Sequence, residues 1–125
     1  MASDYDALVS WLRGEYGEAL RWVASFDHGQ FTHRVLFVRD DLKTELTDRQ
    51  LDIVVHRSLA VFNKDHVEDV YAHLGEARAL VVEHELATAA HVYVGSDRGV
   101  VVKFEPGVTV EVPGFAAACR ERLDA

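Results

Sequence analysis

The chain has 125 residues, of which 49% are hydrophobic and 27% are charged. This length and balance fit a single compact domain over residues 1–125, large enough to bury a core without a disulfide or a structural metal. Its 21 acidic and 13 basic residues give a formal net charge of −8, which disfavours nonspecific binding to nucleic acid or to an anionic membrane surface.

The sequence also indicates a compartment. Its apolar runs are far shorter than the roughly 20 residues that cross a bilayer, and residues 1–4 include an acidic residue and no basic one. The single cysteine, Cys119, excludes an internal disulfide and any thiolate cluster. We therefore expect a cytoplasmic protein without a membrane span or a secretion signal. The basic residues comprise ten arginines and three lysines, which fits either a high-salt cytoplasm or a GC-rich genome.

The chain begins with a predicted helix and a predicted strand. Apolar residues at offsets of three, four and seven predict an amphipathic helix over residues 5–12. From Leu20 the period changes to two, which predicts a strand with Leu20, Trp22, Ala24 and Phe26 on one face.

A turn at residues 27–30 joins this strand to a second one, from Phe31 to about Arg39. Residues Val35 to Val38 are apolar on both faces of that strand, as in strands that are covered on both sides. We therefore expect a hairpin whose second strand lies in the centre of the sheet.

The clearest helix start lies at Thr47. Thr47 is a good N-cap, Gln50 stands where the capping box places its glutamine, and Leu46 can pack on Leu51. This helix ends near Asn63, a residue that tolerates the left-handed conformation. Its apolar stripe consists of Leu51, Val54, Val55, Leu59 and Phe62.

A shorter helix follows, with Asp65 as its cap and Gly75 as its stop. The side chains expected on its buried face are Val67, Val70, Tyr71 and Leu74. Three strands remain, joined by short turns, and we expect them to pair in order as an antiparallel meander. They span about Ala77 to Glu85, Ala89 to Val94 and Gly99 to Phe104.

The C-terminal part predicts one more helix. Alternating valines from Val108 to Val112 can first add a short edge segment to the sheet. Pro113 then opens a helix whose apolar face carries Phe115, Cys119 and Leu123.

This order of elements, α-β-β-α(α)-β-β-β-α, predicts an α+β fold with one five-stranded antiparallel sheet and helices on at least one face. It resembles the roadblock/LC7 domain and, more loosely, the longin and profilin-like domains, with the helix over residues 65–74 as an addition. The roadblock resemblance covers most of the chain. It implies a non-enzymatic adaptor that forms a homodimer by sheet extension and helix pairing and binds a cytosolic GTPase, ATPase or other partner.

A second resemblance rests on three stretches: Val35 to Leu42, Leu46 to Leu51, and the terminal helix at Gly114 and Phe115. Together they are similar to a family of small haloarchaeal proteins without an assigned activity. This resemblance favours a salt-adapted protein and implies no cofactor and no catalytic residue.

Candidate chemistry is sparse. If the last hairpin but one turns at Ala87 and Thr88, His84 and His91 are cross-strand neighbours and weak candidates for metal ligands, with a solvated strand face as the alternative. Cys119 lies on the apolar side of the last helix, where a thiol is usually buried and inert. The sequence has neither a P-loop nor a dinucleotide-binding glycine motif. We expect no enzyme activity and no cofactor.

Two groups of residues are candidate interaction sites. The candidate dimer surface of the first helix consists of Tyr5, Leu8, Trp11 and Leu12. The candidate polar recognition patch consists of Arg39, Asp40 and Asp41, with a turn or capping role as the alternative. The sequence therefore favours a homodimeric adaptor. The alternative is a small-ligand sensor with a pocket between sheet and helices, and a hydrolase or transferase comes third.

Overall fold

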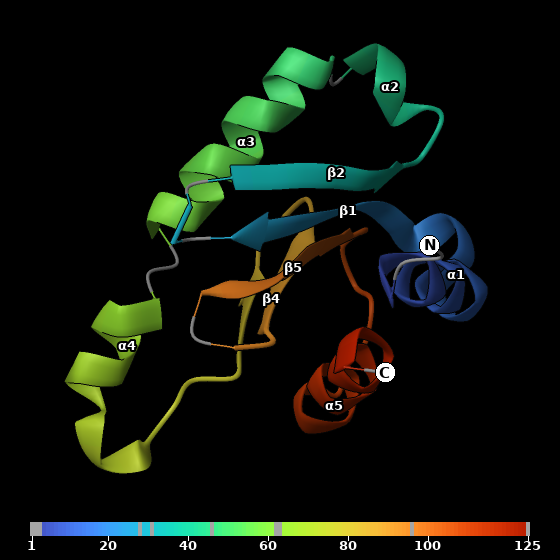
Figure 1. Cartoon of the computed structure of the whole chain (residues 1–125). Helices are drawn as coiled ribbons and strands as arrows, with labels where there is room; N and C mark the ends of the chain where they lie inside the picture. Colours follow the sequence, from blue (N-terminus) through green and yellow to red (C-terminus); the bar gives the residue numbers. More distant parts are fainter. Residues whose placement is uncertain are drawn as a thin grey trace.

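The computed structural model describes residues 4–27, 29–30, 32–45, 47–61, 64–95 and 97–124. Its helices are α1 (Asp4–Tyr16), α2 (Leu42–Glu45), α3 (Asp48–Val61), α4 (Lys64–Val70) and α5 (Val112–Asp124), with the short 3-10 helices η1 (Gly17–Ala19) and η2 (Ala72–Leu74). Its strands are β1 (Leu20–Asp27), β2 (Thr32–Val38), β3 (Ala79–Glu83), β4 (Thr88–Tyr93) and β5 (Arg98–Phe104). Figure 1 shows their arrangement.

The five strands form one antiparallel sheet in the order β2-β1-β5-β4-β3. The strands β1 and β5 pair in the centre although they come from opposite ends of the chain, and β2 and β3 form the two edges. This confirms the predicted α+β fold, its five-stranded antiparallel sheet and the meander of the last three strands.

Helices cover both faces of the sheet. On one face α1 and α5 pack together, and Leu8 and Phe115 join a buried cluster that includes Val102 of β5. On the other face Leu51 of α3 joins a second cluster that includes Trp22 of β1. In Figure 1, α3 accordingly lies across the sheet from α1 and α5. The fold therefore has three layers.

The prediction that the second strand is central is wrong, because β2 is an edge strand. Its apolar residues alternate irregularly between the two clusters: Leu36 and Phe37 pack on the α1/α5 side, while Val35 and Val38 pack on the α3 side. A β-bulge where the register of β1 and β2 shifts accounts for this irregularity. Two helical layers cover β2 on both faces, and the sequence pattern of a covered strand does not reveal whether its edge is paired.

The face predicted for β1 is correct for three of its four residues, Ala24 included. Trp22 and Phe26 lie in the cluster beneath α3, whereas Leu20 belongs to the cluster beneath α1 and α5. The register between β1 and β5 shifts between Leu20 and Trp22, and a shift by one residue moves a side chain to the other face.

The start of α3 has the predicted capping box. The backbone N–H of Thr47 donates to Gln50 Oε1 at 2.9 Å, and the backbone N–H of Gln50 donates to Thr47 Oγ1 at 3.3 Å. Leu51 and Val55 are buried as predicted. Leu46, Phe62 and Asn63, and the side chain of Leu59, lie outside the described residues. The short helix α2 before this start was not predicted.

The predicted buried side of α4 is wrong for three of its four residues, and only Val67 is half-buried. Val70, Tyr71 and Leu74 are 59%, 53% and 68% exposed. The α-helix ends at Val70 and passes into η2, so the helical period on which the prediction depended is interrupted. Lys64 is buried instead, with its Nζ 2.7 Å from Glu68 Oε2. Gly75, at φ +82°, follows η2 as the predicted stop.

The valines from Val108 to Val112 do not extend the sheet. Val108 and Val110 pack against the α1/α5 cluster from a loop, and Val112 is the first residue of α5. The final helix is confirmed, and Phe115 and Cys119 are buried in it. Within the described ranges, no helix is long and apolar enough to cross a membrane.

Strand β5 makes one contact that requires glycine. A Cβ atom on Gly99 would stand 2.1 Å from the carbonyl oxygen of Val92 and 2.8 Å from the ring of Phe26. Both distances are far inside van der Waals contact, so a side chain at this position would force β4 and β5 apart.

Candidate interaction surfaces

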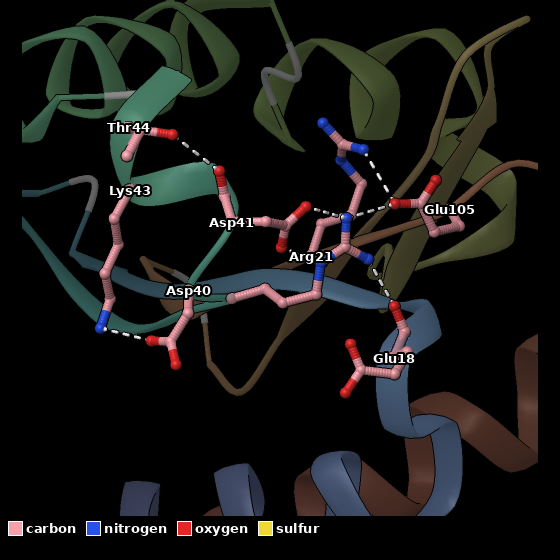
Figure 2. Close-up of polar contacts among 8 residues, drawn as sticks. Glu18, Arg21, Asp40, Asp41, Lys43, Thr44 and Glu105 are labelled. Atoms are coloured by element: carbon pink, nitrogen blue, oxygen red, sulfur yellow. Dashed lines mark hydrogen bonds and ion pairs between the residues drawn. The ribbon is translucent and has the colours of Figure 1, made fainter.

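The predicted polar patch is built around Arg39, directly after β2. Its guanidinium donates to both carboxylate oxygens of Asp41, from Nε to Oδ1 at 2.5 Å and from Nη2 to Oδ2 at 2.9 Å. It also lies 2.8 Å from Glu105 Oε1 and donates to the backbone carbonyl of Glu18. Arg21 reaches the same Glu105 oxygen at 3.0 Å. Figure 2 shows these groups converging, and together they fasten the ends of β1, β2 and β5.

This network neutralises most of its own charge. Hydrogen bonds from Arg39 hold the pKa of the Asp41 carboxyl below its ordinary value, and the same bonds raise the pKa of Arg39. Only 18% of the Arg39 side chain is exposed. A partner would therefore meet Asp40 and Asp41, whose side chains are 96% and 62% exposed, and Asp40 Oδ1 lies 3.0 Å from Lys43 Nζ.

The backbone of this patch is a turn, as the alternative interpretation predicted. The N–H of Leu42 donates to the carbonyl of Arg39 at 2.9 Å, and the N–H of Lys43 donates to that of Asp40 at 3.2 Å. The turn leads into α2. Its structural role does not test a recognition role, which stays a prediction.

An open groove of about 890 Å³ lies beside the patch, between the end of α1 and the end of β2. One wall carries Ser10 and Arg13, and the Arg13 guanidinium lies 4.9 Å from the ring centroid of Phe37. The other wall carries the residues 39–41. Both signs of charge line this groove, so it suits a polar or zwitterionic ligand.

The candidate dimer surface on the first helix does not exist as predicted. Leu8 and Leu12 are fully buried in the core, so they cannot contact a partner, because the apolar stripe of α1 is used to pack against the sheet and α5. Tyr5 and Trp11 are partly exposed. The Trp11 ring lies 4.2 Å from the Arg122 guanidinium, and an interaction role for these two residues stays a prediction.

The prediction that His84 and His91 are cross-strand neighbours is wrong. His91 faces Leu80, and the hairpin turns at Glu85 and Leu86, two residues earlier than predicted. His84 is exposed in the turn, whereas His91 is only 1% exposed. The geometry on which the weak metal candidate depended is therefore absent.

Two buried titratable groups belong to the core. Burial, with a smaller effect of the nearby Lys103 charge, lowers the pKa of His91 to about 4. Burial raises the pKa of the Cys119 thiol to about 12, and its exposed fraction is 0%. This agrees with the prediction of an inert thiol, because a thiolate forms too rarely at neutral pH to act as a nucleophile.

A further polar cluster joins β2 to α3, and sequence reasoning missed it. His33 Nε2 lies 3.0 Å from Asp52 Oδ1, and the His33 ring centroid lies 5.4 Å from that of His56. These residues line a cavity of about 450 Å³ together with Ile53. Asp52 and His56 are one helical turn apart on α3, and their spacing is the one signal that could have been noticed. No three His, Cys, Asp or Glu side chains of the described residues are placed to hold a metal ion.

The edge of β3 is the second feature that sequence reasoning missed. The backbone N–H of Tyr93 donates to the carbonyl of Arg78 at 2.9 Å, so alternate residues from Arg78 onward direct their backbone groups at β4. It follows that Ala79, Val81 and Glu83 direct theirs outward. In the described part of the chain no strand pairs with this edge, and its apolar side chains are partly exposed.

The sheet order, the paired helices α1 and α5 on one face and α3 on the other define a roadblock/LC7-like fold. Solved structures share this fold. The gliding protein MglB from Thermus thermophilus matches with a TM-score of 0.59 and 16% sequence identity, over 96% of this chain and 85% of that chain. A structure described as MglB with tetrameric arrangement matches with a TM-score of 0.57 and 17% identity, over 98% and 89%. The resemblance predicted from the order of elements is thus confirmed for the fold.

The chain belongs to the family described as Domain of unknown function (DUF7522), which it matches over residues 6–124. No curated protein matches the chain in sequence.

Proposed function

We propose that the protein is a non-enzymatic, cytoplasmic interaction module that forms a homodimer and serves as an adaptor for a GTPase or an ATPase. The observation that carries the homodimer is the open edge of β3, where Ala79, Val81 and Glu83 direct backbone donors and acceptors outward. A second copy of the chain can satisfy these groups by extending the sheet across the two copies. The partner class is the one that the roadblock resemblance implies.

The strand edge favours one register. When two copies of β3 pair antiparallel around a two-fold axis at Val81, Val81 faces the partner's Val81 and Ala79 faces the partner's Glu83. Every outward N–H and C=O group of the strand then meets one of the partner. The description of one similar structure as a tetrameric arrangement supports a fold that assembles with itself.

The positions of three reactive groups fit a non-enzymatic role. The Cys119 thiol and the His91 imidazole are in the core, and the Arg39 guanidinium is engaged by Asp41 and Glu105. Each of these groups therefore has a structural use and is poorly placed to meet a substrate.

The homodimer is tested by light-scattering molar mass after size exclusion, in molar KCl and in dilute buffer, with circular dichroism on both samples. The chain has a mass of 14.0 kDa, and we expect twice that mass. Val81→Pro should give a folded monomer, because proline removes an N–H that points away from β4 and so costs no bond within the sheet. Arg34→Glu, on the exposed edge of β2, is the control and should stay dimeric. A wild-type monomer in both buffers would refute the homodimer.

The partner class is tested by cross-linking in cells, followed by mass spectrometry, with Val81→Pro as the comparison. We expect a nucleotide-binding protein among the products of the wild type and its loss with the variant. Recovery of partners that bind no nucleotide would refute the adaptor role.

A small-ligand sensor is the second candidate, because the polar groove of about 890 Å³ lies between α1 and the sheet. It predicts a metabolite that stays bound during purification and is lost in Arg13→Glu. Native mass spectrometry measures this directly, and an empty wild-type protein would count against the sensor.

A further inference from the structure

The groove of about 890 Å³ between α1 and the end of β2 holds a guanidinium without an ion pair. Arg13 is exposed, and its guanidinium lies 4.9 Å from the ring centroid of the half-buried Phe37. This cation–π contact holds the guanidinium at the wall of the groove. No carboxylate of the described residues pairs with it. A guanidinium stacked on a ring keeps its in-plane N–H groups available for a carboxylate.

The end of α1 supplies the opposite charge to the same groove. The helix ends at Tyr16, and the next two residues, Gly17 and Glu18, also line the groove. The backbone carbonyl of Glu18 accepts from Arg39, but its carboxylate takes part in none of the contacts drawn in Figure 2. That carboxylate has no ion-pair partner within the described ranges. Because a helix C-terminus also carries a partial negative charge, this end of the groove favours a cationic group.

The opposite wall, residues 39–41, adds little charge of its own. Arg39 engages both carboxylate oxygens of Asp41, and Asp40 Oδ1 lies 3.0 Å from Lys43 Nζ. Arg39 is also joined to Glu105, so this wall is fixed to the end of β5. The charges that the groove leaves unpaired are therefore those of the opposite wall, on α1 and directly after it.

Two glycines leave space beside these charges. A Cβ atom on Gly14 or Gly17 would meet no atom of a neighbouring segment within 4 Å. The volume of the groove lies in the range of small-molecule sites, about 300–1,000 Å³. We propose that the groove binds a small zwitterion, whose carboxylate pairs with Arg13 and whose ammonium group pairs with Glu18. Free amino acids and short peptides share this chemistry. The inference rests on the sensor role, the second candidate function above.

The test uses three peptides that differ in charge. Triglycine carries a carboxylate and an ammonium group, N-acetyltriglycine only the carboxylate, and triglycinamide only the ammonium group. Binding is followed by heteronuclear NMR, through the side-chain Nε–H of Arg13 and the backbone N–H groups of residues 14–18. We expect triglycine to bind at least about tenfold more tightly than either singly charged peptide, because each of those lacks one charge-assisted contact. Glycine is the fourth probe, and its binding in preference to triglycine identifies a free amino acid as the ligand.

Variants of exposed residues assign each charge. Arg13→Gln should remove the preference for triglycine over triglycinamide, and Glu18→Gln should remove the preference over N-acetyltriglycine. Gly14→Leu should abolish binding without changing any charge, because the leucine side chain fills the groove. Arg57→Gln is the matched control, since Arg57 is exposed on α3, across the sheet from α1. It should leave all dissociation constants unchanged.

The outcomes separate the zwitterion site from the sensor role. Equal binding of the three peptides, a preference that survives Arg13→Gln, or no binding of any of the four probes would overturn the zwitterion site. A purified wild-type protein that carries an uncharged or singly charged metabolite in this groove would support the sensor and also overturn the zwitterion site. A wild-type protein that is empty after purification but binds triglycine through Arg13 and Glu18 would count against the sensor and support the zwitterion site.

Discussion

Acidification should destabilise this fold through His91. The ordinary pKa of histidine is 6.5, and burial between β3 and β5 lowers that of His91 to about 4. Between these values the unfolded chain binds a proton that the folded chain does not, so stability is complete above pH 6.5 and falls as the pH drops towards 4. Each pH unit corresponds to 1.36 kcal/mol, which gives a loss of about 2 kcal/mol at pH 5 and about 3 kcal/mol at pH 4.

The assay is urea unfolding at fixed ionic strength from pH 7.5 to pH 4.5, with His91→Leu as the comparison. The variant keeps all other titrating groups, including Asp41 and Glu68, whose lowered pKa values also cost stability once the pH falls through their range. The difference between the two proteins therefore isolates His91. We expect the wild type to lose about 2 kcal/mol more than His91→Leu between pH 7 and pH 5. Parallel curves for the two proteins would refute the assignment.

Three other predictions can be checked by unfolding and labelling. Gly99→Ala should destabilise the fold by about 3 kcal/mol or more, because its Cβ would overlap the backbone of β4. Gly14→Ala has open space around it in α1 and should instead stabilise the fold by about 0.5–1 kcal/mol. Equal effects of the two variants in urea unfolding would contradict the packing described for β5. Arg39→Ala should lower the melting temperature clearly more than Lys43→Ala, because Arg39 joins three strand ends whereas the Lys43–Asp40 ion pair is exposed to solvent. A larger decrease for Lys43→Ala in calorimetry would contradict the network. Cys119 should react with a thiol reagent only at the rate of unfolding, so rapid labelling of the native protein would show that α5 is not packed as described.

Much of the fold could be predicted because its signals are local. The capping box at Thr47 involves a residue and its third neighbour, and the change from helical spacing to alternation at Leu20 is visible within a few residues. The order of such elements was enough to indicate the sheet and its roadblock-like class.

The wrong predictions share a physical cause, which is that they concern contacts between distant segments. The apolar run of β2 reflects two covering helical layers and does not show where its edge lies. The turn at Glu85 and Leu86 contains no glycine, asparagine or proline, so its position had no local signal. Leu8 and Leu12 were assigned to a partner because nothing in α1 itself shows that α5 covers them. The outward groups of β3 depend on the hydrogen-bond pattern with β4, which no residue type encodes.

The central pairing of β1 with β5 determines when this protein can fold. The Arg21–Glu105 ion pair beside it joins residues 84 positions apart, so closing this contact costs the entropy of a long loop. The hairpin β1–β2 and the meander β3–β4–β5 can form early, but they meet only after the last strand is available. During synthesis one edge of β1 therefore stays unpaired until residue 104 has left the ribosome. The chain is most prone to aggregation during this interval.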